Sequence, residues 1–112
     1  MKDYLYIIRG GDDLSSYSPE QMQAHMQDWQ KWMGSIAAEG KLVGGEPLEK
    51  PGKTLVDSGK KVIDRPLAEG KELVGGYLIM KADNLDEAVQ LAKDCPGFEH
   101  NCSIEVREIS QL

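Results

Sequence analysis

His25 and Asp64 are the two candidates for proton transfer in this sequence, because of where they lie in the predicted elements. Histidine titrates near neutral pH, and His25 lies about 60° from the centre of the apolar stripe of its predicted helix, at the border of the core. Asp64 follows an apolar strand and precedes Arg65-Pro66, so it could act as a general base or orient a histidine. The structural alternatives are a hydrogen-bonded, half-buried histidine and an aspartate that caps a turn.

The segment that begins at Asp64 is rich in charge. It places five charged side chains within nine residues, between two strand-like apolar runs. A ligand site in this region would be built from Trp29, Arg65, Glu69, Lys71 and Glu72. Arg65 could bind a carboxylate through two guanidinium nitrogens. In the alternative interpretation the charges form a solvated face, and Trp29 packs the helix against the sheet together with Trp32.

The overall composition is that of a soluble globular domain, and we expect one domain over residues 1–112. The chain is 40% hydrophobic and 29% charged, with a formal net charge of −6. An acidic chain with no basic cluster larger than Lys60-Lys61 is a poor partner for nucleic acid. No apolar run approaches the ~20 residues of a membrane span, and the N-terminus lacks a signal-peptide cleavage site. We therefore expect a cytoplasmic protein without a membrane partner.

The sequence predicts neither a metal nor a cofactor. Cys95, His100 and Cys102 have a C-x4-H-x-C spacing, which matches no standard zinc arrangement. Both cysteines are expected to be reduced thiols, as is usual in the cytoplasm. The glycine pairs do not form the G-x-G-x-x-G fingerprint of a dinucleotide site.

Apolar periodicity and turn residues predict six strands and two helices. Ser18-Pro19-Glu20-Gln21 has the composition of a capping box and begins a long amphipathic helix over residues 19–39. Asn84 and Glu87 begin a second helix, which ends before Pro96. The strands are expected at residues 4–8, 41–48, 54–56, 61–63, 73–81 and 103–109.

This order of elements predicts an α+β fold. It reads β-α-β, an inserted β-hairpin, then β-α-β, which is the ferredoxin-like β-α-β-β-α-β arrangement. Two helices can cover only one face of the sheet, whereas residues 4–8 are apolar at every position. We therefore expect the free face to meet a second copy. The prediction is a homodimer in which two sheets enclose a dimeric α+β barrel.

Several short motifs occur in a common order along nearly the whole chain: Ser18-Pro19-Glu20, His25-Met26, Gly40 to Gly45, Gly75 to Ile79, Leu85 to Ala88 and Glu105-Val106-Arg107. With these motifs the sequence resembles the YCII-related family, in particular its DGPF subgroup. In the signature loop, the positions that keep the subgroup pattern are Asp64, Pro66, Glu69, Lys71 and Glu72. Arg65 and Leu67 stand where the pattern has glycine and phenylalanine.

The resemblance implies a ferredoxin-like fold, a dimeric α+β barrel and a pocket between sheet and helix that this loop partly lines. It does not imply a known reaction for the subgroup. In the better-known YCII-type members, a helix histidine paired with an aspartate is the suspected catalytic couple. Counted from the helix-ending glycine, that histidine would align near Trp29, one turn beyond His25.

Three functions are compatible with these features. The first is a homodimer that binds a small polar metabolite in the sheet-helix pocket. The second is an acid–base lyase, isomerase or dehalogenase-like enzyme that uses His25 and Asp64. The third is an accessory protein in sigma-factor-linked transcription regulation, because relatives of the subgroup are encoded near or fused to sigma factors.

Overall fold

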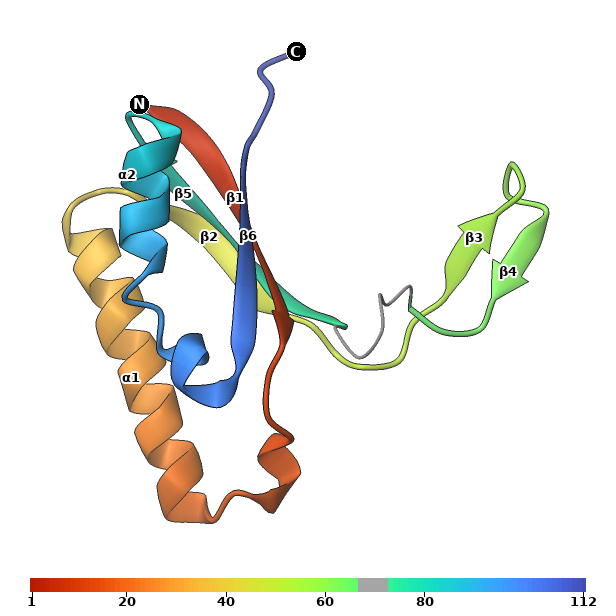
Figure 1. The fold of residues 1–112 in the computed structure, drawn as a ribbon, viewed down its shortest axis with the longest axis horizontal. Helices are drawn as coiled ribbons and strands as arrows, with labels where there is room; N and C mark the ends of the chain where they lie inside the picture. Colours follow the sequence, from red (N-terminus) through yellow and green to blue (C-terminus); the bar gives the residue numbers. More distant parts are fainter. Residues whose placement is uncertain (67–72) are drawn as a thin grey trace.

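The structure is a computed structural model that describes residues 1–66 and 73–112 (Figure 1). Its strands are β1 (Lys2–Gly10), β2 (Leu42–Pro47), β3 (Thr54–Val56), β4 (Lys61–Ile63), β5 (Val74–Ala82) and β6 (Cys102–Glu108). The helices are α1 (Pro19–Ala38) and α2 (Leu85–Ala92), with short 3-10 helices η1 (Leu14–Ser16) and η2 (Pro96–His100). No helix among the described residues is long and apolar enough to span a membrane.

Four strands form an antiparallel sheet in the order β2-β5-β1-β6. β1 lies between its two partners, with Tyr6 opposite both Leu78 and Val106. The order of the strands and the two helices confirm the predicted ferredoxin-like α+β fold. The pairing of β2 shifts register between Leu42 and Gly44, and a Cβ on Gly45 would lie 2.5 Å from the Tyr77 carbonyl oxygen. Glycine therefore permits the close approach of β2 to β5.

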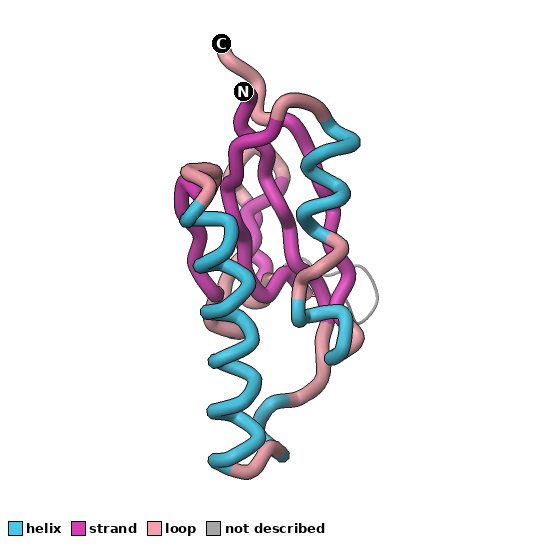
Figure 2. Tube along the Cα trace, turned by 90° about the vertical axis from the view of Figure 1, so that its left-hand side faces the viewer, coloured by secondary structure: helices cyan, strands magenta, loops and turns pink. Residues whose placement is uncertain are grey.

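Both helices cover the same face of the sheet (Figure 2). The core between them contains alternate side chains of β1 and β5 and the inward side chains of α1 and α2: Tyr4, Tyr6, Ile8, Leu78, Met80, Ala82, Trp32, Ile36, Ala88 and Ala92. Burial of this apolar surface is the main stabilising contribution. The Tyr6 hydroxyl, which is buried in this layer, donates a hydrogen bond to the Ala88 carbonyl oxygen.

Trp32 packs α1 against the rest of the core, as one interpretation of the sequence expected: it is only 7% exposed, and its indole nitrogen donates to the Leu91 carbonyl oxygen at 3.2 Å. Met26 differs from expectation, because the apolar periodicity of residues 19–39 places it on the buried stripe, whereas it is 50% exposed. The N-terminal half of α1 extends beyond the end of the sheet (Figure 2), and the buried residues of the helix, Trp32 and Ile36, lie in its C-terminal half.

The opposite face of the sheet has no helix over it in the described part of the chain (Figure 2). Its centre consists of Leu5, Ile7, Tyr77 and Ile79, all half-buried. Leu5 pairs with Ile79 and Ile7 with Tyr77, so the four side chains form one block, which we call the open face. β1, expected to be covered on both faces, is covered on one face within a single chain.

The predicted hairpin is confirmed as a separate two-stranded sheet of β3 and β4. It projects away from the rest of the molecule (Figure 1), and we call residues 48–66 the arm. Its turn places Asp57, Ser58 and Gly59 at positive φ, where glycine carries no steric penalty. This conformation explains the turn composition that predicted the hairpin.

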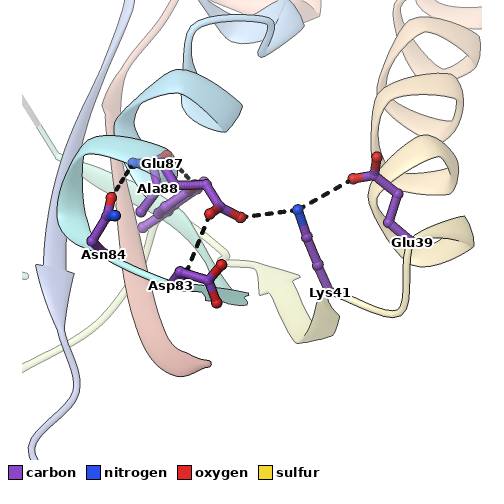
Figure 3. A network of polar contacts seen from close by, with 7 residues as sticks. Glu39, Lys41, Asp83, Asn84, Glu87 and Ala88 are labelled. Carbon is purple, nitrogen blue, oxygen red and sulfur yellow. Dashed lines mark hydrogen bonds and ion pairs between the residues drawn. The ribbon is translucent and has the colours of Figure 1, made fainter.

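A polar network joins the segment between α1 and β2 to the start of α2 (Figure 3). The Lys41 ammonium lies 2.9 Å from a Glu87 carboxylate oxygen and 3.6 Å from a Glu39 oxygen. The Asn84 side chain accepts from the Glu87 backbone N–H at 2.8 Å, as expected for the N-cap of α2. The network connects the C-terminal end of α1 to the start of α2.

Candidate functional site

A cluster of histidines and aromatic side chains lies where α1 passes η2. His25 and Trp29 come from α1, His100 ends η2, and Tyr17 precedes α1. The rings of His25 and His100 are perpendicular, with centroids 4.4 Å apart. The rings of Trp29 and Tyr17 meet the His25 ring edge-on, with their centroids 6.2 Å and 6.3 Å from the His25 centroid. We call these four residues the histidine cluster.

The cluster depends on two glycines that allow the surrounding backbone to approach. A Cβ on Gly97, within η2, would lie 3.3 Å from the Trp29 ring, so η2 packs closely against α1. A Cβ on Gly11 would lie 2.9 Å from the Cys102 sulfur, and Gly11 has φ of +107°. A side chain at either position would move the segment that carries His100.

His100 is held by a chain of polar contacts. Its Nδ1 lies 2.5 Å from the Tyr17 hydroxyl oxygen, and that hydroxyl donates to an Asp12 oxygen at 3.5 Å. Asn101 donates to the other Asp12 oxygen at 2.8 Å. The Tyr17 hydroxyl therefore holds the His100 ring through Nδ1, and Nε2 is the ring nitrogen that this chain of contacts leaves free for another group.

His25 differs from His100 in its hydrogen bonding. Its Nδ1 is buried and has no hydrogen-bond partner among the described residues. Burial, followed by the nearby His100 ring, lowers the pKa of His25, although Asp28 acts in the opposite direction. The neutral imidazole is therefore favoured, and a neutral imidazole can accept a proton or bind a polar group.

The two thiols near the cluster are poor nucleophiles. Cys95 and Cys102 are both free. Burial raises the pKa of Cys95 to about 11. Burial, and to a lesser degree Asp12, also raises the pKa of Cys102. Thiolates are the reactive form of cysteine, so the chemistry available here belongs to the imidazoles.

Asp64, the second predicted proton-transfer residue, lies in the arm. Its side chain is 84% exposed and pairs with the Lys53 ammonium at 3.3 Å. The arm and α1 lie at opposite ends of the molecule in Figure 1. Within one chain, the structure does not bring His25 and Asp64 together.

The predicted ligand residues are distributed over several parts of the chain. Trp29 belongs to the histidine cluster. Arg65 and Asp64 line an open hollow of about 600 Å³ at the base of the arm, together with Lys50 and Lys53. The predicted ligand residues Glu69, Lys71 and Glu72 lie outside the described residues.

The sequence interpretation omitted three members of this arrangement: Asp12, Tyr17 and His100. His100 was considered only as a metal ligand beside the two cysteines. The described residues contain no group of three or more metal-ligating side chains. Asp12 and Tyr17 follow no periodic pattern in the sequence. The only signal was composition, namely a polar turn and an aromatic residue just before the helix that carries His25.

Fold and site together define a ferredoxin-like α+β domain with a histidine cluster at one end of its helical layer. The YCII-related domain matches residues 3–112, and the chain belongs to this family. Placement in the DGPF subgroup remains a resemblance.

One solved structure with a similar fold is 5-chloro-2-hydroxyhydroquinone dehydrochlorinase (TftG) from Burkholderia phenoliruptrix AC1100, in complex with 2,5-dihydroxybenzoquinone. It is 19% identical, with a TM-score of 0.48, and the match covers 95% of this chain and 93% of that chain. A likeness of this size does not indicate a reaction for this chain. No curated protein matches the sequence.

Proposed function

We propose that this protein is a cytoplasmic homodimer that binds a small polar molecule at the histidine cluster. The observation that carries the proposal is the buried Nδ1 of His25, which no described residue hydrogen-bonds, beside a His100 ring held by Tyr17. A buried polar atom without a hydrogen-bond partner costs stability. A ligand hydroxyl or carboxyl group that displaced the side chains over Nδ1 would supply the missing hydrogen bond and recover that cost.

The surroundings support a ligand that combines polar and flat apolar parts. Trp29 and Tyr17 contribute ring surface around His25, and ring surface favours flat groups. His100 Nε2 provides a second polar contact from a fixed direction, because Tyr17 and Asp12 orient the ring. Small-molecule sites commonly combine apolar surface with a few oriented polar groups.

The experiment is a thermal-shift screen against small hydroxylated and carboxylated compounds, followed by calorimetric titration of each hit. We expect His25→Ala to raise the dissociation constant by on the order of tenfold or more, because it removes the principal polar contact. Met26→Ala is the matched control, since Met26 neighbours His25 on α1 but is 50% exposed. Equal affinities for His25→Ala and Met26→Ala would show that the histidine cluster is not the binding site.

Acid–base catalysis is the second candidate function, and the lowered pKa of His25 favours it. A neutral imidazole next to a second, oriented imidazole can accept a proton from a bound substrate. The proposed couple is therefore His25 with His100. Asp64, 84% exposed in the arm, would require a second copy to approach His25. In a turnover assay on any hit, loss of activity in His100→Gln but not in Asp64→Asn would support the histidine couple, and the reverse result would favour Asp64.

A further inference from the structure

The arm carries apolar side chains that are exposed in a single chain. Leu55 and Val62 lie opposite each other in the hairpin and are 63% and 54% exposed. Leu48, at the base of the arm, is 48% exposed. Opposed residues on two paired strands share one face, so Leu55 and Val62 form a small apolar surface near the far end of the arm.

The polar contacts found in the arm hold its own shape. Lys53 pairs with Asp64 at 3.3 Å, and the Thr54 hydroxyl donates to the Arg65 carbonyl oxygen at 2.8 Å. Among residues 1–66 and 73–112, β3 and β4 pair only with each other (Figure 1). A two-stranded hairpin is at best marginally stable alone in water. A hairpin with such short strands and an exposed apolar pair is therefore expected to pack on another surface.

Charge distinguishes the arm from the rest of the chain. Residues 48–66 contain five Lys or Arg and three Asp or Glu, which gives +2 in a chain whose formal net charge is −6. The remaining residues therefore carry −8. Opposite charges on two surfaces favour their association and accelerate their encounter. We call the residues outside the arm the body. The acidic body of a second copy is thus complementary in charge to the arm.

We propose that the arm packs on the body of a second copy, with Leu55 and Val62 as its apolar contact and Lys60 and Lys61 facing acidic side chains. In a twofold dimer each copy provides one arm and receives one. This inference rests on the homodimer of the proposed function. It adds that residues of the arm, which include Asp64 and Arg65, belong to the interface.

The first test measures the dimer dissociation constant by sedimentation equilibrium for the double variant Leu55→Ser, Val62→Thr. We expect an increase on the order of tenfold or more, because two apolar contacts are lost. Val89→Thr is the control, since Val89 is an exposed apolar residue of α2, at 37%. Lys60→Glu with Lys61→Glu should also weaken association and should reduce its dependence on salt. An unchanged constant in the double variant would overturn the proposal.

The second test detects the contact directly and does not depend on the stability of a variant. Dimers are assembled from 14N- and 15N-labelled chains and treated with a zero-length reagent that joins lysines to carboxylates. Mixed-isotope cross-links between Lys60 or Lys61 and acidic residues outside the arm are expected. Arm cross-links found only within one isotope, or not at all, would overturn the proposal.

These outcomes separate the arm from the other parts of the proposed function. If Ile79→Glu on the open face abolishes the dimer while the arm variants leave it unchanged, the homodimer stands and the arm proposal fails. If the arm variants weaken the dimer but His25→Ala does not affect ligand affinity, the arm proposal stands and the binding site is wrong. A wild-type protein that is monomeric at micromolar concentration would refute both the arm proposal and the homodimer.

Discussion

At the scale of single residues, the two imidazoles of the histidine cluster pack against each other but differ in their hydrogen-bond partners. His100 has the Tyr17 hydroxyl in hydrogen-bonding range and an Asp12 oxygen at 4.0 Å, whereas His25 has a buried nitrogen without a partner in the described part of the chain. A second positive charge 4.4 Å from the first ring would be unfavourable. The cluster therefore favours at least one neutral ring.

This difference predicts a pH dependence of stability. The pKa of His25 in the folded state lies below its ordinary value of 6.5. The folded state therefore binds the proton less readily than the unfolded state, and stability present above pH 6.5 is lost as the pH falls through the folded pKa. We expect the urea midpoint of His25→Gln to fall less between pH 7 and pH 5 than that of the wild type. Parallel pH profiles for the two proteins would contradict the assignment.

Sequence reasoning identified His25 and Trp29 but not the rest of the cluster. His25 was recognisable because a helix has a fixed period, which places a residue relative to the core. Tyr17, Asp12 and His100 meet only because η2 folds back beside α1, and no local pattern encodes that long-range contact. The His25–Asp64 couple remains a prediction, one that a single chain does not assemble.

At the scale of elements, the contact between Lys41 and Glu87 also has a measurable consequence. The hydrogen bond from Lys41 lowers the pKa of Glu87 below its ordinary 4.5. The stabilisation is therefore present above pH 4.5 and is lost as the pH falls through the folded-state pKa of Glu87. We expect Glu87→Gln to be less stable than wild type at pH 7 and to lose less stability on acidification.

The control for this prediction is Asp86→Asn. Asp86 and Glu87 both lie in the first turn of α2, so either substitution removes a negative charge from the N-terminus of a helix. The difference between the two variants in thermal denaturation isolates the contact with Lys41. Equal losses would show that the helix end, and not the ion pair, is responsible.

Most elements could be predicted because their signals are local. Ser18 and Gln21 form both hydrogen bonds of the predicted capping box, at 2.8 Å and 3.1 Å. The hairpin strands have the predicted bounds, Thr54–Val56 and Lys61–Ile63. The exposure of Met26 could not be predicted, because how far a helix extends past the end of its sheet depends on packing between distant segments.

At the scale of the whole molecule, the open face predicts self-association. Leu5, Ile7, Tyr77 and Ile79 form an apolar block that no helix covers in the described part of the chain. Such a surface usually marks an interface. We expect Ile79→Glu to shift the protein to a monomer in light scattering coupled to gel filtration, because it places a charge in the centre of the contact.

Val89→Glu is the matched control for Ile79→Glu, since it introduces the same charge at an exposed apolar residue of α2, which covers the other face of the sheet (Figure 2). A dimer that survives Ile79→Glu with unchanged affinity would exclude the open face as the interface. The dimeric α+β barrel remains a proposal until this measurement. The role as an accessory to sigma-factor-linked regulation also remains a prediction, and a pull-down that recovers no transcription component would refute it.

The central position of β1 determines when the protein can fold during its synthesis. Residues 2–10 are synthesised before the other strands of the sheet, yet their partners are residues 74–82 and 102–108. β1 therefore has no partner strand, and the apolar side chains of β1 and α1 stay exposed, until β5 and finally β6 have been synthesised. Pairing between such distant segments is slow and exposes the growing chain to aggregation. The late strands complete the fold, and a chain shortened before β6 would leave β1 as an unpaired edge.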